Sequence, residues 1–203
     1  MIKNERRWKT VDGHSPIIPF LTKISPLSKE AIEDFDTRTF TLFFEKKRFI
    51  LKPGMIADQL FFLKKGVVHG FIKEEGRQIT SWISEENQII GSIRTLLTMG
   101  PCGEYLQAVE DCELIALPIA FLAEIYEKYR EIQFICRRLW EHIYHEAEER
   151  ACLVRISSAE KKYKKFLENH PGLINRIPLK YIASYLGMTM ETLCRIRGRQ
   201  NKH

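Results

Sequence analysis

Hydrophobic residues in the first half of the chain recur in short runs that are typical of β-strands. From about residue 37 to residue 117 these runs are RTFTLFF, KRFILK, DQLFFLKKG, VVHGFIKEEG, QITSWIS, QIIGSI, YLQAVED and CELIALP. Turn-forming residues separate many of them, among them Pro53-Gly54, Gly66, Glu75-Gly76 and Gly91. Strands of this length, with turns at intervals of roughly ten residues, predict a sandwich, a barrel or a compact roll.

The pattern is helical on both sides of this region. Ser28 can cap a short helix within residues 26–36, and the residues after Pro118 suit another short helix. A longer helix is expected at about residues 128–154, where apolar residues recur at spacings of three and four. We expect this stripe to pack against its copy in a second subunit, and the alternative is a helix that lies entirely on its own domain. The expected dimer residues are Ile132, Ile135, Leu139 and Ile143.

Ser157 and Glu160 have the spacing of a capping box, which predicts a further helix that runs through Leu167. A domain boundary is therefore expected just before this helix. It divides the chain into a sensor domain with its dimerising helix, residues 1–154, and a smaller C-terminal domain, residues 155–203.

The segment from Leu179 to Arg199, LKYIASYLGMTMETLCRIRGR, has the pattern of a helix-turn-helix. Ala183 is small where two helices would cross closely, and Gly187 suits the left-handed backbone of a tight turn. Thr189 can cap the second helix. The expected core of the motif is Ile182, Leu186, Met188, Leu193 and Ile196. The residues left to face outwards, towards DNA, are Met190, Glu191, Thr192, Arg195 and Arg199.

The charge is unevenly distributed along the chain, whose net charge is +6. Residues 155–203 carry eleven Lys or Arg and three Asp or Glu, a net of +8, whereas residues 1–154 carry 21 and 23, a net of −2. A small basic domain on a near-neutral body suits the binding of phosphates. The alternative is a solvated helix face formed by Lys161, Lys162, Lys164 and Lys165.

Patterns of metal binding and catalysis are missing from the sequence. The five cysteines form no C-x-x-C pair, and His142 and His145 lack the further ligands that a zinc site needs. We therefore expect no metal and no enzymatic activity. A cupin-like small-molecule enzyme is an alternative, but it requires several inward-facing histidines, and the strand region contains only His69. A third alternative is a ligand sensor that acts by protein contact and binds DNA weakly.

Apolar runs in this chain are short. None approaches the ~20 residues that are needed to cross a membrane, and the basic N-terminus is not followed by an apolar signal region. We expect a cytoplasmic protein with no membrane partner.

These elements together resemble the family of the cyclic-AMP receptor protein and FNR, the Crp/Fnr bacterial transcription regulators. The segments that carry the resemblance are IASYLGMTMETLCRIR, DQLFFLKKGVVHGFIKEEG and SAEKKYKKFLENHP, within a match of about residues 25–200. The resemblance implies an α+β fold with a cyclic-nucleotide-binding-like β-roll, a long dimerising helix and a C-terminal helix-turn-helix of the winged-helix type. It also implies a homodimer on pseudo-palindromic double-stranded DNA, a small-molecule effector, and RNA polymerase as a further partner.

The resemblance assigns roles to individual residues of the second helix. Glu191 lies where the family's Glu accepts a hydrogen bond from cytosine, and Arg195 lies where its Arg reaches guanine. Met190 replaces a polar base contact, which suggests an altered site. The candidate phosphate contacts are Lys180, Thr189, Thr192 and Arg199. Many relatives continue into a β-hairpin wing, which is missing after the second helix here, so we expect weaker and more salt-sensitive DNA binding.

The family's nucleotide pocket fits less well. It has Gly-Glu-Leu for the ribose and Arg-Ser or Arg-Thr for the phosphate, where this chain has Gly91-Ser92-Ile93 and Pro101-Cys102-Gly103. Arg94 is nearby in a different register. The residues therefore disfavour cyclic-nucleotide binding, no cofactor is assigned, and the pocket is expected to take another small molecule or to be empty. Its candidate residues are Gly91, Ser92, Ile93, Arg94, Cys102 and Gly103.

Overall fold

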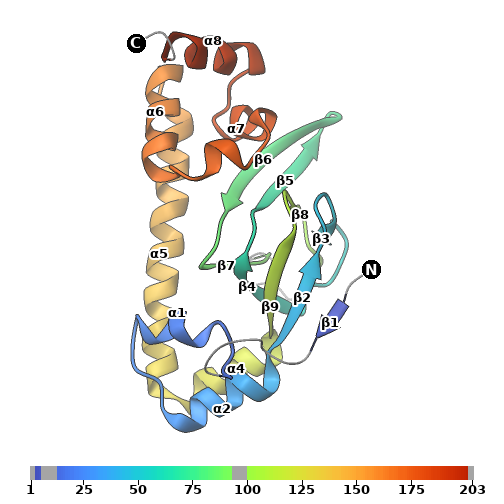
Figure 1. Ribbon diagram of the computed structural model, residues 1–203, viewed down its shortest axis with the longest axis vertical. Coiled ribbons are helices and arrows are strands. Elements are labelled where there is room, and N and C mark those ends of the chain that lie inside the picture. The colour runs from blue at the N-terminus through green and yellow to red at the C-terminus, as the bar shows by residue number, and fades with distance from the viewer. Residues whose placement is uncertain (1–2, 6–12, 93–99, 201–203) are drawn as a thin grey trace.

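Strands dominate the first half of the chain, as the sequence predicts. The computed structural model describes residues 3–5, 13–92 and 100–200, and it arranges their strands in two antiparallel sheets (Figure 1). One sheet has the order β1-β2-β9-β4-β7, and the other has the order β3-β8-β5-β6. The strands are β1 (Lys3–Glu5), β2 (Phe40–Phe44), β3 (Phe49–Leu51), β4 (Gln59–Lys65), β5 (Val68–Glu74), β6 (Arg77–Ser84), β7 (Gln88–Ile90), β8 (Tyr105–Ala108) and β9 (Cys112–Pro118). All eight hydrophobic runs contain one of these strands, which confirms the predicted roll.

Alternation along the strands divides the first sheet between two cores. In β4, Phe61 and Leu63 belong to the core between the sheets, whereas Phe62 faces the helices. In β9, Leu114 belongs to the first core and Ile115 to the second. Successive side chains of a strand point to opposite faces, so this sheet is covered on both sides.

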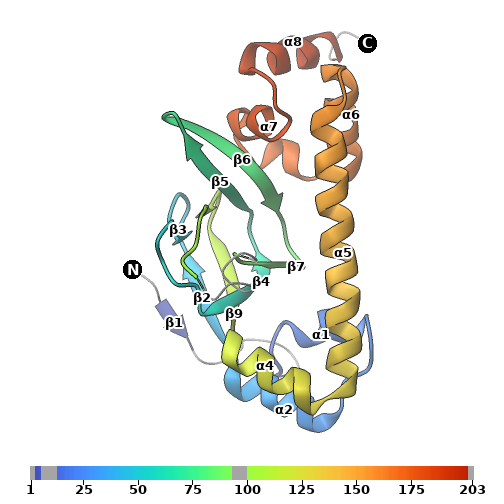
Figure 2. The same ribbon diagram turned by 180° about the vertical axis from the view of Figure 1, so that it is seen from behind.

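Helices cover the outer face of that sheet and extend beyond it. They are α1 (Ile18–Thr22), α2 (Lys29–Arg38), α4 (Ile119–Lys128), α5 (Arg130–Arg155), α6 (Ala159–Asn169), α7 (Leu179–Tyr185) and α8 (Met190–Gln200), with a 3-10 turn at Leu173–Asn175. The long α5 runs beside the roll from α4 at one end to the α6–α8 region at the other (Figures 1 and 2). The predicted long helix is confirmed, and so is the cap of α2, where the Ser28 side chain accepts a hydrogen bond from the Ala31 amide.

The predicted start of α6 was wrong by one residue. Ser158, and not Ser157, is the N-cap, and its side chain accepts a hydrogen bond from the Lys161 amide. Because Ser157 and Ser158 are adjacent and chemically identical, spacing alone favoured the wrong one. The helix continues past Leu167 to Asn169.

The C-terminal helices share a core with the roll. Val67, Ile83 and Val109 of the roll pack in one cluster with side chains of α5, α6, α7 and α8. The expected boundary between residues 154 and 155 thus falls at the last residue of α5, just before the turn to α6, while the packing continues across it. Among the described residues, no helix is long and apolar enough to cross a membrane.

The expected dimer stripe of α5 is largely used within the chain. Ile132 and Ile135 are buried in the core between the first sheet and its helices, and Leu139 packs against that core. Ile143 is half-buried and lines a cavity. The first turns of α5 therefore match the alternative, a helix on its own domain, and their apolar residues are already covered before any partner binds.

Candidate DNA-binding helix and effector cavity

The helix-turn-helix forms from α7 and α8 as the sequence predicts. Gly187 has φ +61, which places the turn in the left-handed region that favours glycine. The amide of Met188 donates to the Ala183 carbonyl at 3.0 Å and closes the turn. Four side chains of the predicted core are buried and Met188 packs against them: Ile182, Leu186, Leu193 and Ile196.

Lys162 of α6 holds the end of α7. Its Nζ donates to the Leu186 carbonyl at 3.1 Å, and the side chain is 8% exposed. The C-terminal carbonyls of a helix lack partners within the helix, and a lysine satisfies one of them here. The alternative of a solvated helix face is therefore wrong for Lys162, and its contact with α7 was not predicted from the sequence.

The outward face of α8 carries unpaired charges. Glu191 and Arg195 are exposed, and within the described part of the chain neither forms an ion pair with another side chain. Met190 is 40% exposed beside them. Figure 1 shows α8 at the end of the molecule farthest from α4. These side chains are free to contact an external partner.

The candidate phosphate contacts differ in their surroundings. Lys180 is exposed, with its Nζ over the Tyr181 ring. Thr189 caps α8, because its Oγ1 accepts the Thr192 amide at 3.2 Å, as the sequence predicted. Arg199 donates to Glu160 at 3.1 Å, in a pair exposed on both sides. An exposed pair of this kind is weak, so Arg199 can exchange Glu160 for a phosphate.

The α7 helix docks on the edge of the second sheet. Ser184 Oγ accepts the Thr80 amide at 2.8 Å and donates to the Gln78 carbonyl at 3.1 Å. Both partners lie on β6, the last strand of that sheet. The serine thus satisfies backbone groups that an edge strand leaves open, and it fixes α7 to the roll.

Arg176 adds a charged contact between the roll and the segment that precedes α7. Its guanidinium donates to both carboxylate oxygens of Glu86, at 2.9 and 2.6 Å, and to Glu110 at 2.5 Å. The hydrogen bonds from Arg176 lower the pKa of Glu86 to about 2. Two-pronged pairs of this type are the strong ones among protein hydrogen bonds, so Arg176 ties the segment before α7 to the turns of the roll.

His69 is fully buried where β5 meets α7. Its ring lies 4.1 Å from the Tyr181 ring and 5.0 Å from that of Phe71, and Nε2 lies 3.2 Å from Gln107 Oε1. Burial, the largest cause, lowers its pKa to about 4. His69 is therefore a packed residue. No group of three or more His, Cys, Asp or Glu side chains is placed to hold a metal ion in the described ranges.

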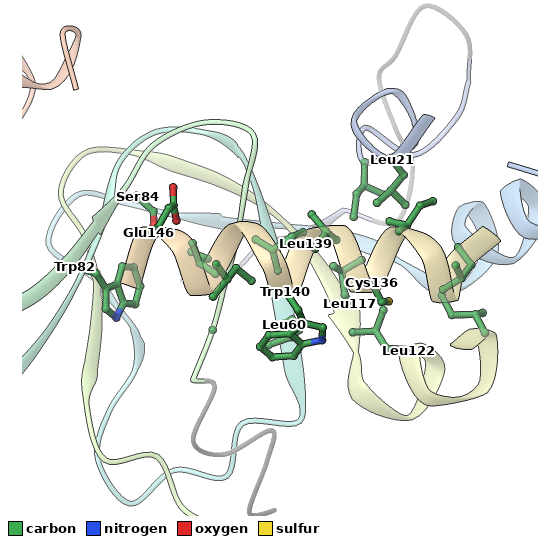
Figure 3. A pocket seen from close by; sticks show the side chains of 18 of the residues that line it. Leu21, Leu60, Trp82, Ser84, Leu117, Leu122, Cys136, Leu139, Trp140 and Glu146 are labelled. Atoms are coloured by element: carbon green, nitrogen blue, oxygen red, sulfur yellow. The ribbon is translucent and has the colours of Figure 1, made fainter. Parts of the chain in front are cut away.

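A cavity of about 320 Å³ lies between the roll and α5 (Figure 3). Apolar side chains of β4, β9, α4 and α5 line most of it. Toward one end of this part of α5 lie Trp82, Ser84 and Glu146, and toward the other lie Cys136, Leu117 and Leu122. The cavity is therefore apolar along its length and polar at one end.

Trp82 reaches this polar end because of a glycine on the neighbouring strand. Gly70 pairs with Trp82 across β5 and β6, and a Cβ on Gly70 would lie 2.1 Å from the indole ring. The indole Nε1 donates to Glu104 at 3.0 Å. Glu104 is half-buried, and burial raises the pKa of its carboxyl above the usual range.

Comparisons with known proteins agree with this architecture. The family model of the cyclic nucleotide-binding domain matches residues 41–129, which span β2 to α4. Regulatory protein HlyX of Actinobacillus pleuropneumoniae is 25% identical over 170 residues, which are 78% of this chain and 70% of HlyX. The chain is therefore similar to regulators of the Crp/Fnr type, and its residues 41–129 match the cyclic nucleotide-binding domain.

Two solved structures show how far the Crp/Fnr fold extends. FixK2 from Bradyrhizobium japonicum superposes with a TM-score of 0.68 at 19% identity, over 81% of this chain and 85% of FixK2. A protein of Eubacterium rectale, described as a transcriptional regulator of the crp/fnr family, gives a TM-score of 0.70 at 17% identity, over 93% of this chain and 89% of its own. At these identities the likeness concerns the fold.

The predicted pocket residues are only partly brought together. Gly91 lines the cavity, and Ser92 is buried next to it in sequence. Cys102 instead packs in the core of the roll, where its Sγ donates to the Glu104 carbonyl, and Gly103 is exposed. Neither of these last two residues is among the described residues that line this cavity. The remaining two predicted pocket residues, Ile93 and Arg94, lie outside the described ranges.

Proposed function

We propose that this protein is a sequence-specific DNA-binding transcription regulator that works as a homodimer on a pseudo-palindromic site. The observation that carries the proposal is the exposed pair Glu191 and Arg195 on α8, a helix that Leu193 and Ile196 anchor from its buried side. A helix of this kind fits the major groove, where Arg can bond guanine and Glu can accept from cytosine. RNA polymerase is a further expected partner of such a regulator.

A selection experiment tests this function. The full chain is incubated with a random duplex library, and bound DNA is recovered and sequenced over several rounds. We expect an inverted repeat with half-sites roughly one helical turn apart. Recovery of no common sequence from DNA that binds at low salt would point to a protein-contact sensor with only general affinity for phosphates.

The dimer surface is proposed to be the exposed face of α5. Trp140, Tyr144, Ala147, Ala151 and Val154 follow one another at spacings of four and three, and each is exposed. Tyr144 is 71% exposed. A repeat of this kind is the seam along which two helices pack. Among the predicted residues, only Leu139 and Ile143 lie in the same part of α5, and they face the cavity.

A charge on this seam tests the dimer. Tyr144→Glu places a carboxylate opposite its copy, and we expect the dimer to dissociate at least about tenfold more readily because two like charges would be buried together. Sedimentation velocity across a concentration series measures this. The matched control is Glu149→Gln, which removes a charge from the side of α5 that faces away from this seam and should leave the association unchanged.

Regulation through the cavity is part of the proposal. Trp82 lines the cavity and Thr80, two residues away on β6, donates to Ser184 of α7. A molecule that displaces Trp82 would move the strand on which α7 is docked. Figure 1 shows β6 lying between the rest of the roll and α7.

A further inference from the structure

We propose that the cavity between the roll and α5 binds an apolar molecule with one hydrogen-bond-donating head group and no anionic group. This inference deepens the proposed function, since it names the chemical class of the effector. Three features of the cavity carry it: the apolar length, a carboxylate with one donor, and the balance of charge at the polar end.

The length of the cavity suits an apolar body. Its described lining takes aliphatic side chains from α1, β4, β7, β9, α4 and α5, including Leu21, Leu60, Ile89, Leu117, Leu122 and Leu139. A cavity of about 320 Å³ lies at the lower end of the range for small-molecule sites. Burying apolar surface there would be the main source of affinity.

Glu104 provides the recognition of the head group. Of the groups in the described part of the chain, only the Trp82 indole donates a hydrogen bond to its carboxylate. A carboxylate accepts several hydrogen bonds, and a half-buried one gains from each further donor. Burial also raises its pKa, which a donor in the cavity would oppose. A hydroxyl, an amide or an amine on the ligand meets this requirement.

Anions are disfavoured by the other charges at this end. The described lining contains two carboxylates, Glu104 and Glu146, and one guanidinium, Arg150. Arg150 lies 4.0 Å from Glu146, which also accepts from Gln88 at 3.2 Å. Arg150 is thus already matched by a carboxylate, and a phosphate placed beside Glu104 would face a like charge in a partly dry site.

A second copy of the chain does not need to fill this cavity. The exposed seam through Tyr144 and Ala151 lies roughly a third of a turn around α5 from Leu139 and Ile143, at 3.6 residues per turn. Trp140 is the residue that borders both surfaces. The dimer and the ligand therefore use different faces of the same helix.

The test uses probes that share one chain and differ in the head group. Purified full-length dimer is titrated by calorimetry with 1-decanol, decylamine, decanoate and cyclic AMP, below the concentrations at which the probes aggregate. We expect decanol and decylamine to bind at least about tenfold more tightly than decanoate, and cyclic AMP to give no heat of binding. Quenching of Trp82 fluorescence, compared with Trp82→Phe, reports whether the probe sits in the cavity.

Two variants separate the apolar and polar contributions. Glu104→Gln keeps the shape and removes the carboxylate, so the preference for decanol over decanoate should shrink to less than about threefold. Leu139→Trp fills the cavity and should abolish the binding of all decyl probes. Thermal unfolding of both variants checks that they fold. If Leu139→Trp does not fold, the loss of head-group preference in Glu104→Gln still tests the inference.

The outcomes distinguish this inference from the proposed function. Binding of cyclic AMP, equal binding of decanoate and decanol, or no binding of any decyl probe would overturn the inference. DNA binding is measured on the same preparation. If the protein binds DNA but none of the probes, the proposed regulatory function is supported and the proposed effector class is wrong. If the protein binds probes but not DNA, the proposed function is wrong.

Discussion

The charged side chains on the outward face of α8 and those in the cavity beside α5 differ in whether they have partners within the chain. On α8, Glu191 and Arg195 are exposed and form no ion pair with a described side chain. They do not pair with each other, although they carry opposite charges and are four residues apart on one helix. In the cavity, Arg150 lies against Glu146, and Glu104 accepts from Trp82. Exposed charges without partners suit DNA, which offers phosphates and bases. A cavity in whose described lining the one guanidinium already faces a carboxylate, and the second carboxylate is bound only by an indole, suits a ligand without phosphate. The two proposed partners, DNA and a small molecule, would therefore be recognised by two kinds of chemistry.

The largest expected effect comes from separating the buried and exposed sides of α8. Leu193→Ala removes a fully buried side chain between α7 and α8 and should lower the free energy of unfolding by about 3 kcal/mol. Met190→Ala on the exposed side of the same helix should change it by less than about 0.5 kcal/mol. Urea unfolding of both variants measures the difference. Equal losses of unfolding free energy in the two variants would mean that Leu193 is not on the buried side of α8 and Met190 is not on the exposed side.

The next effect concerns the contact that holds α7 to the roll. Arg176→Ala leaves Glu86 and Glu110 without their partner, and we expect a loss of about 2 kcal/mol in unfolding free energy. Arg48→Ala, which breaks an exposed pair with Glu45, is the matched control and should cost less than about 1 kcal/mol. If the two variants lose the same stability, the Arg176 cluster is no stronger than an ordinary surface pair.

A smaller effect is expected from acid. The folded-state pKa of His69, about 4, lies below its ordinary value of 6.5, so between these values the unfolded chain binds the extra proton. Stability should therefore fall as the pH drops from about 6.5 toward about 4, by on the order of 1–2 kcal/mol at pH 5. Gln107 opposes this shift and Lys180 reinforces it.

His69→Phe tests this assignment, because it keeps an aromatic ring beside Tyr181 and removes the titrating group. Unfolding free energies of both proteins are measured at intervals from pH 7 to pH 5. The variant should lose less stability than the natural chain across this range. The same slope in both proteins would place the acid sensitivity elsewhere.

Local features of the fold were predictable because their signals are local. Gly187, with its small helical core on either side, specified the turn, and the eight hydrophobic runs specified strands. Contacts between distant segments left no such signal. Arg176 meets Glu86, which is 90 residues away, and Ser184 meets Thr80, which is 104 away. No spacing of residues along the chain indicates that Glu86 has a cationic partner.

The cavity shows the same limit. A family pattern directed attention to Cys102 and Gly103, whereas the side chain that faces the cavity is that of Glu104. Its partner Trp82 lies on β6, and Gly70 on the neighbouring β5 leaves space for the indole because it has no side chain. Only the pairing of β5 with β6 brings these residues together, so the polar end of the cavity could not be found by local spacing.

The most direct test of the account is the effect of Arg195 on DNA specificity. Affinities of the natural chain, Arg195→Ala and Arg195→Lys are measured for the selected site, for single base-pair variants of each half-site, and for random DNA at matched salt. The account predicts that Arg195→Ala removes discrimination at one base pair per half-site, about 1–3 kcal/mol, and that Arg195→Lys restores only part of it, because lysine lacks the planar fork of arginine. Equal weakening of the selected site and random DNA, with Arg195→Lys restoring both, would contradict it, since Arg195 would then bind a phosphate.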